Sequence, residues 1–381
     1  MRIHIAVLNL RMGGQLSSMT SLVQLLAAAG IDAQIALPSG VPSTGKRDVT
    51  AFCERPLRQR VRQTWHMLRT LPLDPARDVV HLVVPTPAFA PIAKLLPVPS
   101  DRVLVQYEGP PTHFDGPHLR ALRDDPLLFG PRIVLNNALW AHAARPLQVH
   151  HLATYPALAQ WLRANGFGRV HEVANVTVFA PEDGEAGQHP PWPDAATTIN
   201  VAYIGHCHPV KGVPDLIAAF ALAAPQRPDL HMRLALSADG DLASIDRQIP
   251  ALPDEVRGRV HRHGLVPVAA WLQHADVLAL PYRSLASTTL YPSLLLEADA
   301  AGCPLLIADL PDLRAVLPDS NLRVQWVAPR DVAALAQALI QLPKRPPTVD
   351  AVPLLKLPPA ADRVRELARI YAAMAGHQEQ Q

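Results

Sequence analysis

The stretch Val201-Ala-Tyr-Ile-Gly-His-Cys-His-Pro-Val-Lys-Gly212 decides the fold class of this chain. Its apolar beginning predicts a buried β-strand, and the glycine that follows predicts a turn ahead of a helix. A turn of this kind presents unpaired backbone N–H groups and the positive end of the helix dipole to an anion. Lys211 adds a full positive charge, so the stretch predicts an anion-binding site.

A second stretch, Thr289-Leu-Tyr-Pro-Ser-Leu-Leu-Leu-Glu297-Ala-Asp-Ala-Ala-Gly302, predicts an apolar helix that ends at a glycine. Glu297 stands among leucines and alanines in this helix. A carboxylate in such surroundings needs a partner that offsets its desolvation. Hydroxyl groups of a ligand would serve as that partner.

Apolar runs of strand length alternate with helical patterns in both halves of the chain. The alternation predicts parallel sheets covered by helices. We expect strands at residues 3–10, 32–37, 79–84, 102–106, 133–135, 149–153, 170–173, 199–204, 231–236, 260–264 and 277–280. We expect helices at residues 16–29, 88–96, 136–144, 155–165, 213–224, 268–274, 331–341 and 362–375, with a turn at residues 238–240.

Several spaced motifs of the second half resemble, in their order, the C-terminal nucleotide-binding domain of family 4 glycosyltransferases. They are Gly205-His206, Lys211-Gly212, Ala238-Asp239-Gly240, Ala275-Asp276 with Pro281, and Thr289 followed by Glu297-Ala-Asp-Ala-Ala-Gly302. The resemblance implies an α/β fold of the GT-B type, in which two Rossmann-like doubly wound domains face a central cleft. The length of 381 residues also favours two domains.

The domain boundaries follow from composition and from the resemblance. Residues 178–196 are polar and rich in glycine and proline, which is typical of an interdomain linker. We therefore expect an acceptor-side domain at residues 1–177 and a nucleotide-sugar-binding domain at residues 197–358. The resemblance implies that a C-terminal helix within residues 359–381 crosses back to the first domain.

The resemblance also implies the activity: retaining transfer of a sugar from a nucleotide-diphosphate sugar, as co-substrate, to a small-molecule, glycan or lipid-linked acceptor. No metal and no other cofactor is implied. The implied catalytic residues are Lys211, His206 and Glu108. The implied contacts to the donor nucleotide and diphosphate are Gly13, Gly14, Gly205, His206, Lys211, Leu265 and Glu297, and those to the donor sugar are Glu108, Thr289, Leu290 and Tyr291.

Three of these positions depart from the family pattern. His206 replaces an arginine, Thr289 replaces an acid, and Glu108 stands where a histidine is usual. Histidine is charged only at lower pH, so the diphosphate is less well neutralised unless another basic residue, such as Arg283, contributes. Three interpretations stay open: a glycosyltransferase with an unusual donor, a pseudo-glycosyltransferase that forms an unusual bond, and a catalytically silent subunit that binds a nucleotide sugar.

Two features of the first half have both an ordinary and a functional interpretation. Gly13-Gly14 follows the first strand and allows a ligand to approach the backbone closely, although any tight strand-to-helix turn favours glycine. Glu108 follows a strand at the edge where open α/β sheets bind ligands, although it is also an ordinary acid at a strand end. For Glu108 we favour the functional interpretation.

Metal binding is weakly indicated. Asp239-Gly-Asp241 has the spacing of a carboxylate pair that holds a divalent ion, but it matches the family's Gly-Asp-Gly turn, and hard cations need more converging oxygens. The pairs His206/His208 and His261/His263 supply too few ligands for a closed zinc site. We expect His261 and His263 to be half-buried structural residues of a strand.

Composition limits the remaining classes. A net charge of +2 implies no strong attraction to nucleic acid. The three cysteines, Cys53, Cys207 and Cys303, are widely spaced, which argues against a disulfide framework. Neither a secretory signal nor a membrane-spanning segment is apparent, so we expect a cytoplasmic protein.

Residues 55–69 predict a basic amphipathic helix. An apolar stripe of Leu57, Val61, Trp65 and Leu68 runs along it, with Arg58, Arg60, Arg62 and Arg69 elsewhere. Such a helix either packs its stripe on the sheet with its arginines in water, which we favour, or lies on an anionic membrane surface. The second alternative would make the protein peripheral at the inner face of the membrane.

Overall fold

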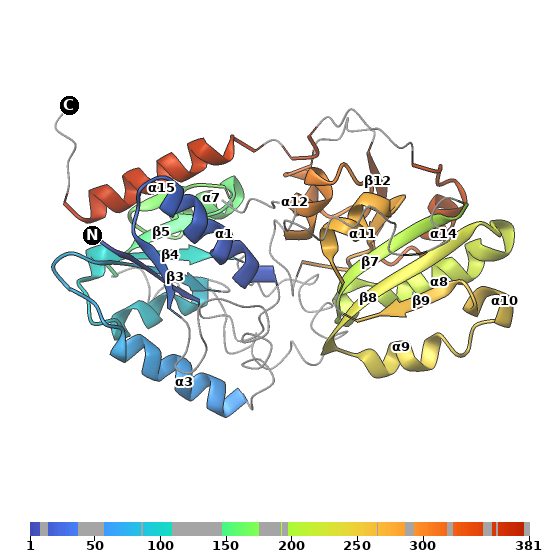
Figure 1. Cartoon of the computed structure of the whole chain (residues 1–381), viewed down its shortest axis with the longest axis horizontal. Helices are drawn as coiled ribbons and strands as arrows, with labels where there is room; N and C mark the ends of the chain where they lie inside the picture. Colours follow the sequence, from blue (N-terminus) through green and yellow to red (C-terminus); the bar gives the residue numbers. More distant parts are fainter. Residues whose placement is uncertain are drawn as a thin grey trace. The chain divides into compact units, whose positions relative to one another are not determined.

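The structure is a computed structural model that describes residues 1–7, 14–36, 57–84, 87–108, 147–174, 192, 197–264, 266–285, 293–317, 323–345, 353–355 and 357–376. These residues form two compact α/β units (Figure 1). The described parts of residues 1–108 and 147–174, together with residues 357–376, form the first unit. Trp192 and the described parts of residues 197–355 form the second.

The first unit is built on a parallel sheet whose described strands follow the order β2-β1-β3-β4-β5-β6. The inner strands at Ile3–Val7, Val79–Val84 and Val103–Tyr107 are mainly apolar and buried along their whole length, as expected in a parallel sheet covered by helices, whereas the edge strands at Ala33–Ala36 and Val170–Glu172 are partly exposed. The strands are β1 (Ile3–Val7), β2 (Ala33–Ala36), β3 (Val79–Val84), β4 (Val103–Tyr107), β5 (His150–Ala153) and β6 (Val170–Glu172).

One face of this sheet is covered by the first helix and by the last one. Leu22 and Leu26 from the former, and Leu367 and Tyr371 from the latter, share a core with Ile5 of β1. The C-terminal helix is therefore an integral part of the first unit (Figure 1). The described helices of this unit are α1 (Gly14–Ala28), α3 (Leu57–Thr70), α7 (Pro156–Ala164) and α15 (Ala360–Met374), with 3₁₀ segments η1 (Pro87–Leu95) and η2 (Ser100–Arg102).

The second unit has a parallel sheet with the order β12-β11-β10-β7-β8-β9. Its strands are β7 (Ile199–Cys207), β8 (Leu230–Gly240), β9 (Val260–His263), β10 (Val277–Leu280), β11 (Leu305–Ala308) and β12 (Val324–Val327). Starting from β9, the order is that of the Rossmann fold, with a switch in direction between β7 and β10.

Helices pack on both faces of the second sheet. One face forms a core with α8 and α14, through residues such as Val201, Phe220 and Leu339. The alternate residues of the strands point to the opposite face of the sheet. There α11 contacts β7 and also packs against α12. The described helices are α8 (Val213–Ala223), α9 (Leu242–Gln248), α10 (Asp254–Arg257), α11 (Val268–His274), α12 (Ser293–Ala300), α13 (Pro311–Arg314) and α14 (Val332–Ile340), with 3₁₀ turns η3 (Pro209–Lys211) and η4 (Ala224–Gln226).

The predicted α/β architecture is confirmed, and several local expectations are wrong. The segment expected to be a helix at residues 88–96 is a 3₁₀ helix with Pro91 inside it, because proline cannot supply the N–H of an α-helical turn. Residues 238–240 are not a turn, because β8 continues to Gly240, which pairs with Cys207 of β7. Strands β11 and β12 and helices α9, α10 and α13 were not expected. The strand and helix expected at residues 133–144 lie outside the described residues.

The expected apolar stripe of α3 is wrong at Trp65, and the side chains of Leu57 and Val61 lie outside the described part of the chain. Trp65 is 43% exposed, whereas Met67 and Leu68 are buried. A contact with Arg69 explains in part why Trp65 lies at the surface. The guanidinium carbon of Arg69 lies 4.8 Å from the centroid of the Trp65 ring. A tryptophan held this way keeps a face covered without entering the core.

Candidate functional site

The sheet order of the second unit identifies where a ligand is expected. Open α/β sheets bind ligands outside the carboxyl ends of the strands at the switch point, which here lies between β7 and β10. These strands are paired in parallel through Val201 and Val277, so the segments that leave their carboxyl ends start side by side. The segment after β7 contains Lys211, and the segment after β10 contains Pro281, Tyr282 and Arg283.

A bulge in β7 shapes the first of these segments. The predicted glycine turn at Gly205 is wrong, because the strand continues through Gly205 and His206 to Cys207 with an irregular register. Gly205 has a φ of 147°, which side-chain-bearing residues rarely adopt. The hydroxyl of Tyr203 donates a 2.7 Å hydrogen bond to the carbonyl oxygen of His206 and closes the bulge. Tyr203 was not expected to contribute to the site.

His206 is half-buried and is oriented by the neighbouring strand. Its Nδ1 lies 2.6 Å from the hydroxyl oxygen of Ser237 on β8. This hydrogen bond fixes the plane of the imidazole ring and leaves Nε2 as the second polar atom. The structure thus places His206 at the carboxyl edge of the sheet with a defined orientation, and Ser237 is a partner that the sequence did not indicate.

Lys211 is a buried cation at the end of the η3 turn. Its side chain is 6% exposed, and its Nζ lies 4.4 Å from the centroid of the Tyr282 ring. Within the described part of the chain, the ammonium group has no hydrogen bond and no ion pair. Burial lowers the pKa of Lys211 to about 7. A buried lysine without a counter-charge either gives up its proton or gains stability from a bound anion.

The turn around Lys211 depends on Gly212. This residue has a φ of 73°, and a Cβ at this position would lie 1.8 Å from the carbonyl oxygen of Pro281. No side chain fits there. The glycine brings the start of α8 against the end of β10, and the first N–H groups of a helix have no partner inside that helix. Lys211 therefore lies directly before the first turn of α8, in which Pro214 supplies no N–H group.

Arg283 does not add a second uncompensated charge. Its Nε lies 2.7 Å from Oδ2 of Asp215, and its Nη2 lies 2.5 Å from Oδ1. This two-pronged ion pair is largely buried, with side-chain exposures of 18% and 13%. The expectation that Arg283 compensates for the missing arginine at position 206 is therefore not supported by its contacts, because its charge is matched by Asp215.

Glu297 lies in the middle of α12. Leu294, Leu295, Leu296 and Ala298 around it are buried, whereas Glu297 itself is partly exposed. It is thus less buried than the sequence suggested. Asp299, two residues later, is anchored to the 353–355 segment, because its carboxylate accepts hydrogen bonds from the backbone N of Leu354 at 2.6 Å and from Nη2 of Arg323 at 3.0 Å.

Glu108 follows β4 in the first unit and is 6% exposed. Its Oε1 accepts a hydrogen bond from the side-chain amide of Gln106. Gln106 lies on the sheet face that also carries His81, whose Nδ1 is 2.7 Å from the hydroxyl of Tyr371 on α15. Glu108 is therefore a buried, oriented carboxylate rather than a side chain of an exposed loop.

Five expected site residues lie outside the described residues: Gly13, Leu265, Thr289, Leu290 and Tyr291. Gly14 is the first residue of α1. Of the remaining ones, the structure brings Gly205, His206 and Lys211 together at the end of β7, and it places Glu297 on α12 of the same unit.

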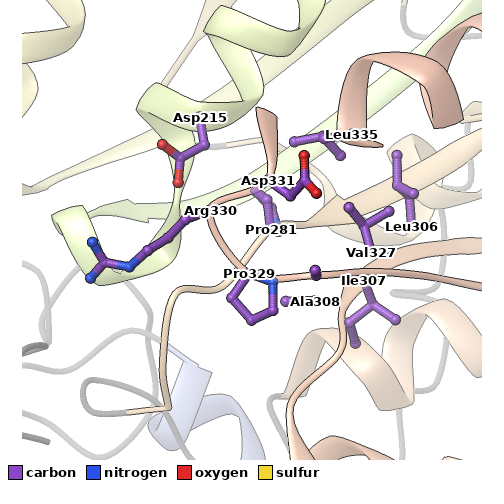
Figure 2. A pocket seen from close by; sticks show the side chains of 11 residues that line it. Asp215, Pro281, Leu306, Ile307, Ala308, Val327, Pro329, Arg330, Asp331 and Leu335 are labelled. Atoms are coloured by element: carbon purple, nitrogen blue, oxygen red, sulfur yellow. The ribbon is translucent and has the colours of Figure 1, made fainter. Parts of the chain in front are cut away.

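A small pocket lies beside this region, at the carboxyl ends of β10, β11 and β12 (Figure 2). Its lining is mainly apolar and includes Ile307, Val327 and Leu335, while Arg330 extends its guanidinium away from these side chains. Asp331 is occupied as the N-cap of α14, where it accepts a hydrogen bond from Ala334. No residue expected for the site lines this pocket.

Three of the residues that suggested a metal, Asp241, His261 and His263, have protein partners. Asp241 caps α9 by accepting a 3.0 Å hydrogen bond from the backbone N of Ser244. His261 is hydrogen-bonded to His231 at 3.1 Å, and His263 packs edge-on against Trp271. Among the described residues, no three His, Cys, Asp or Glu side chains are arranged to hold a metal ion. None of the helices within the described ranges has the length and apolarity needed to cross a membrane.

Residues 198–345 match the family "Glycosyl transferases group 1". No curated protein matches the chain by sequence.

Solved structures are similar over nearly the whole chain. Anabaena Alr3699/HepE in complex with UDP and glucose has a TM-score of 0.54 at 15% identity, over 99% of this chain and 95% of that one. A glycosyltransferase from Rickettsia africae has a TM-score of 0.59 at 11% identity, over 99% of both chains. An α,α-trehalose-phosphate synthase (UDP-forming) from Burkholderia vietnamiensis has a TM-score of 0.56 at 14% identity, over 99% and 95%.

These likenesses establish the fold. The chain has the GT-B fold, with two Rossmann-like units that each carry a six-stranded parallel sheet among the described residues. Its second unit carries a region that matches glycosyl transferases group 1 and that contains the buried lysine at the switch point.

Proposed function

We propose that this protein is a glycosyltransferase that moves a sugar from a nucleotide-diphosphate sugar to an acceptor. The observation that carries the proposal is the buried ammonium of Lys211, which has no counter-charge among the described residues and lies at the switch point of the second sheet. Two proteins of similar fold are connected with UDP: HepE was solved in complex with UDP and glucose, and the trehalose-phosphate synthase is described as UDP-forming. The diphosphate of such a donor would supply the negative partner that the Lys211 ammonium does not find among the described residues.

In the proposed mechanism the chain performs two physical tasks. It holds donor and acceptor in contact, and it stabilises the negative charge that grows on the departing diphosphate. Lys211 and the N–H groups at the start of α8 supply this stabilisation, and Glu297 binds hydroxyl groups of the nucleotide. Retention of configuration and independence of metal are further parts of the proposal, supported by the family resemblance of the motifs around Lys211 and Glu297.

A silent subunit that binds a nucleotide sugar is the second candidate. It is favoured by the charges at the site, where Arg283 is paired with Asp215 and His206 replaces an arginine. Such a protein would bind nucleoside diphosphates through Lys211 and Glu297 without releasing them from a sugar. A pseudo-glycosyltransferase, which joins the transferred group through an unusual bond, is the third.

One experiment separates these candidates. The protein is incubated with a panel of nucleotide-diphosphate sugars and acceptors, with and without EDTA, while released nucleoside diphosphate and product mass are followed. A glycosyltransferase releases the diphosphate and yields a product heavier by one sugar residue, insensitive to EDTA. A pseudo-glycosyltransferase yields a product without a glycosidic bond. Calorimetric binding without any release identifies the silent subunit, and the absence of both binding and release contradicts the proposal.

We also propose that α3 contacts an anionic membrane surface when the acceptor is lipid-linked. The helix carries exposed Arg58, Arg62 and Arg69 beside the exposed Trp65, and it contains no acidic residue. Basic and aromatic side chains on one helix bind anionic headgroups. Sedimentation with vesicles of phosphatidylglycerol should remove the wild type from solution but not an Arg62→Glu/Arg69→Glu variant. Equal binding to purely zwitterionic vesicles would contradict this contact.

A further inference from the structure

Three consecutive residues that follow β10 brace the turn that carries Lys211. The carbonyl oxygen of Pro281 occupies the space in which a Cβ of Gly212 would lie. The ring of Tyr282 lies beneath the Lys211 ammonium, and the backbone N of Arg283 donates a 2.8 Å hydrogen bond to the carbonyl oxygen of Val210. The conformation of the lysine turn is therefore set by a segment that is distant in sequence.

The contact between Tyr282 and Lys211 differs in kind from an ion pair. A carboxylate next to a buried lysine would neutralise it and would compete with an incoming anion. An aromatic ring attracts the ammonium through its quadrupole and leaves the charge uncompensated. Tyr282 is 4% exposed, and burial raises the pKa of its phenol, so the ring carries no negative charge at neutral pH.

The ion pair between Arg283 and Asp215 holds the other side of the turn. Asp215 lies in the first turn of α8, and both it and Pro281 line the pocket (Figure 2). The pair joins the start of α8 to the segment after β10 without adding net charge. The brace thus fixes the position of Lys211 while leaving its charge available.

We infer that Tyr282 is a positioning residue for Lys211: its ring holds the lysine ammonium where it meets the diphosphate of a nucleotide ligand. The inference rests on the proposed function, because it assigns the anion that Lys211 binds. Tyr282 acts through Lys211 and contacts neither the sugar nor the base of the nucleotide. Its contribution is therefore confined to the diphosphate.

The test compares the binding of nucleoside diphosphates with that of the corresponding nucleosides. UDP, ADP and GDP are titrated calorimetrically into the wild type, and the one that binds is carried forward together with its nucleoside. The variants are Tyr282→Phe, Tyr282→Leu, Lys211→Met and the double variant Tyr282→Leu/Lys211→Met. Phe220→Leu, which removes a buried ring from the core of the second unit, is the control, and thermal unfolding confirms that each variant is folded.

The ring should matter and the hydroxyl should not. Tyr282→Phe keeps the affinity for the diphosphate within about twofold, whereas Tyr282→Leu lowers it about tenfold. Affinity for the nucleoside stays unchanged in both. Because the two residues act as a unit, the double variant binds no more weakly than Lys211→Met alone.

Two results overturn the inference by itself. One is a loss in Tyr282→Leu that is equal for diphosphate and nucleoside, which would indicate a general structural role. The other is an additive loss in the double variant. If Lys211→Met binds the diphosphate as well as the wild type does, or if the wild type binds no nucleotide, the proposed function fails and the role of Tyr282 fails with it.

Discussion

Gly212 and Pro281 meet backbone to backbone, so that a Cβ on residue 212 would lie 1.8 Å from the carbonyl oxygen of residue 281. This approach joins the lysine turn to the end of the neighbouring strand. A methyl group there must push the two segments apart, and the φ of 73° adds strain for any residue with a side chain.

Gly212→Ala should therefore destabilise the protein by about 3 kcal/mol and displace Lys211. Gly30→Ala is the matched control, because Gly30 has a φ of 76° with open space around its Cβ position, so it should cost about 1 kcal/mol. Urea unfolding of both variants measures the difference. Equal losses would show that the contact with Pro281 contributes nothing.

The lowered pKa of Lys211 predicts how stability depends on pH. The pKa falls from 10.5 to about 7 on folding because the ammonium is buried, so the unfolded chain binds more protons between these values. The contribution of Lys211 to stability therefore rises with pH across this window, and its cost is fully present below about pH 7. Lys211→Met should be more stable than the wild type near neutral pH, and the gap should close towards pH 10.5. A gap that stays constant with pH would contradict the assignment.

The same group makes the binding of a nucleotide sugar depend on pH. The diphosphate of a nucleotide sugar keeps its two negative charges between pH 7 and pH 10.5, so a change in affinity over this range reflects titration of the protein. Above about pH 7 the neutral Lys211 must take up a proton on binding, and the affinity should fall by up to about tenfold per pH unit. Calorimetry in buffers with different ionisation enthalpies detects the proton uptake directly. Lys211→Met should bind weakly and without this slope.

The ion pair between Asp215 and Arg283 predicts a non-additive pattern. Arg283→Ala leaves the largely buried Asp215 without its partner and should cost about 3 kcal/mol, more than the double variant Asp215→Ala/Arg283→Ala. The exposed pair of Asp362 and Arg365 on α15 is the control, and Arg365→Ala should cost less than about 1 kcal/mol. A double variant that loses the sum of both single losses would show that the two side chains do not interact.

The C-terminal helix is fixed to the first unit by a buried hydrogen bond. Burial lowers the pKa of His81 to about 4, so the ring is neutral at physiological pH and pairs with the Tyr371 hydroxyl. Tyr371→Phe leaves Nδ1 of His81 buried without its partner and should cost about 2 kcal/mol. The double variant His81→Leu/Tyr371→Phe removes both polar groups and should recover part of that loss in thermal unfolding. No recovery would mean that packing of the ring, not the hydrogen bond, sets the cost.

Local patterns predicted the fold because a buried parallel strand is an apolar run that can be recognised without its neighbours. Strands β1, β3, β7 and β10 lie within or close to the ranges expected. The sequence also predicted that Lys211 lies just before a helix, because the glycine that ends the turn is its neighbour in the chain. Strands β11 and β12 were missed although β10, which has the same length of four residues, was recognised, so length alone does not explain the miss.

By itself, the sequence determined the α/β class, the family resemblance of the second half, and the presence of a lysine and a carboxylate in the motifs that carry it. Only the tertiary structure decided what surrounds them: Tyr282 beneath Lys211, Ser237 beside His206, and Asp215 paired with Arg283 over 68 residues of chain. The reason is physical. Strand and helix formation follow from side-chain periodicity along the chain, whereas the charge state of a buried group depends on neighbours that only the pairing of β7 with β8 and β10 brings together.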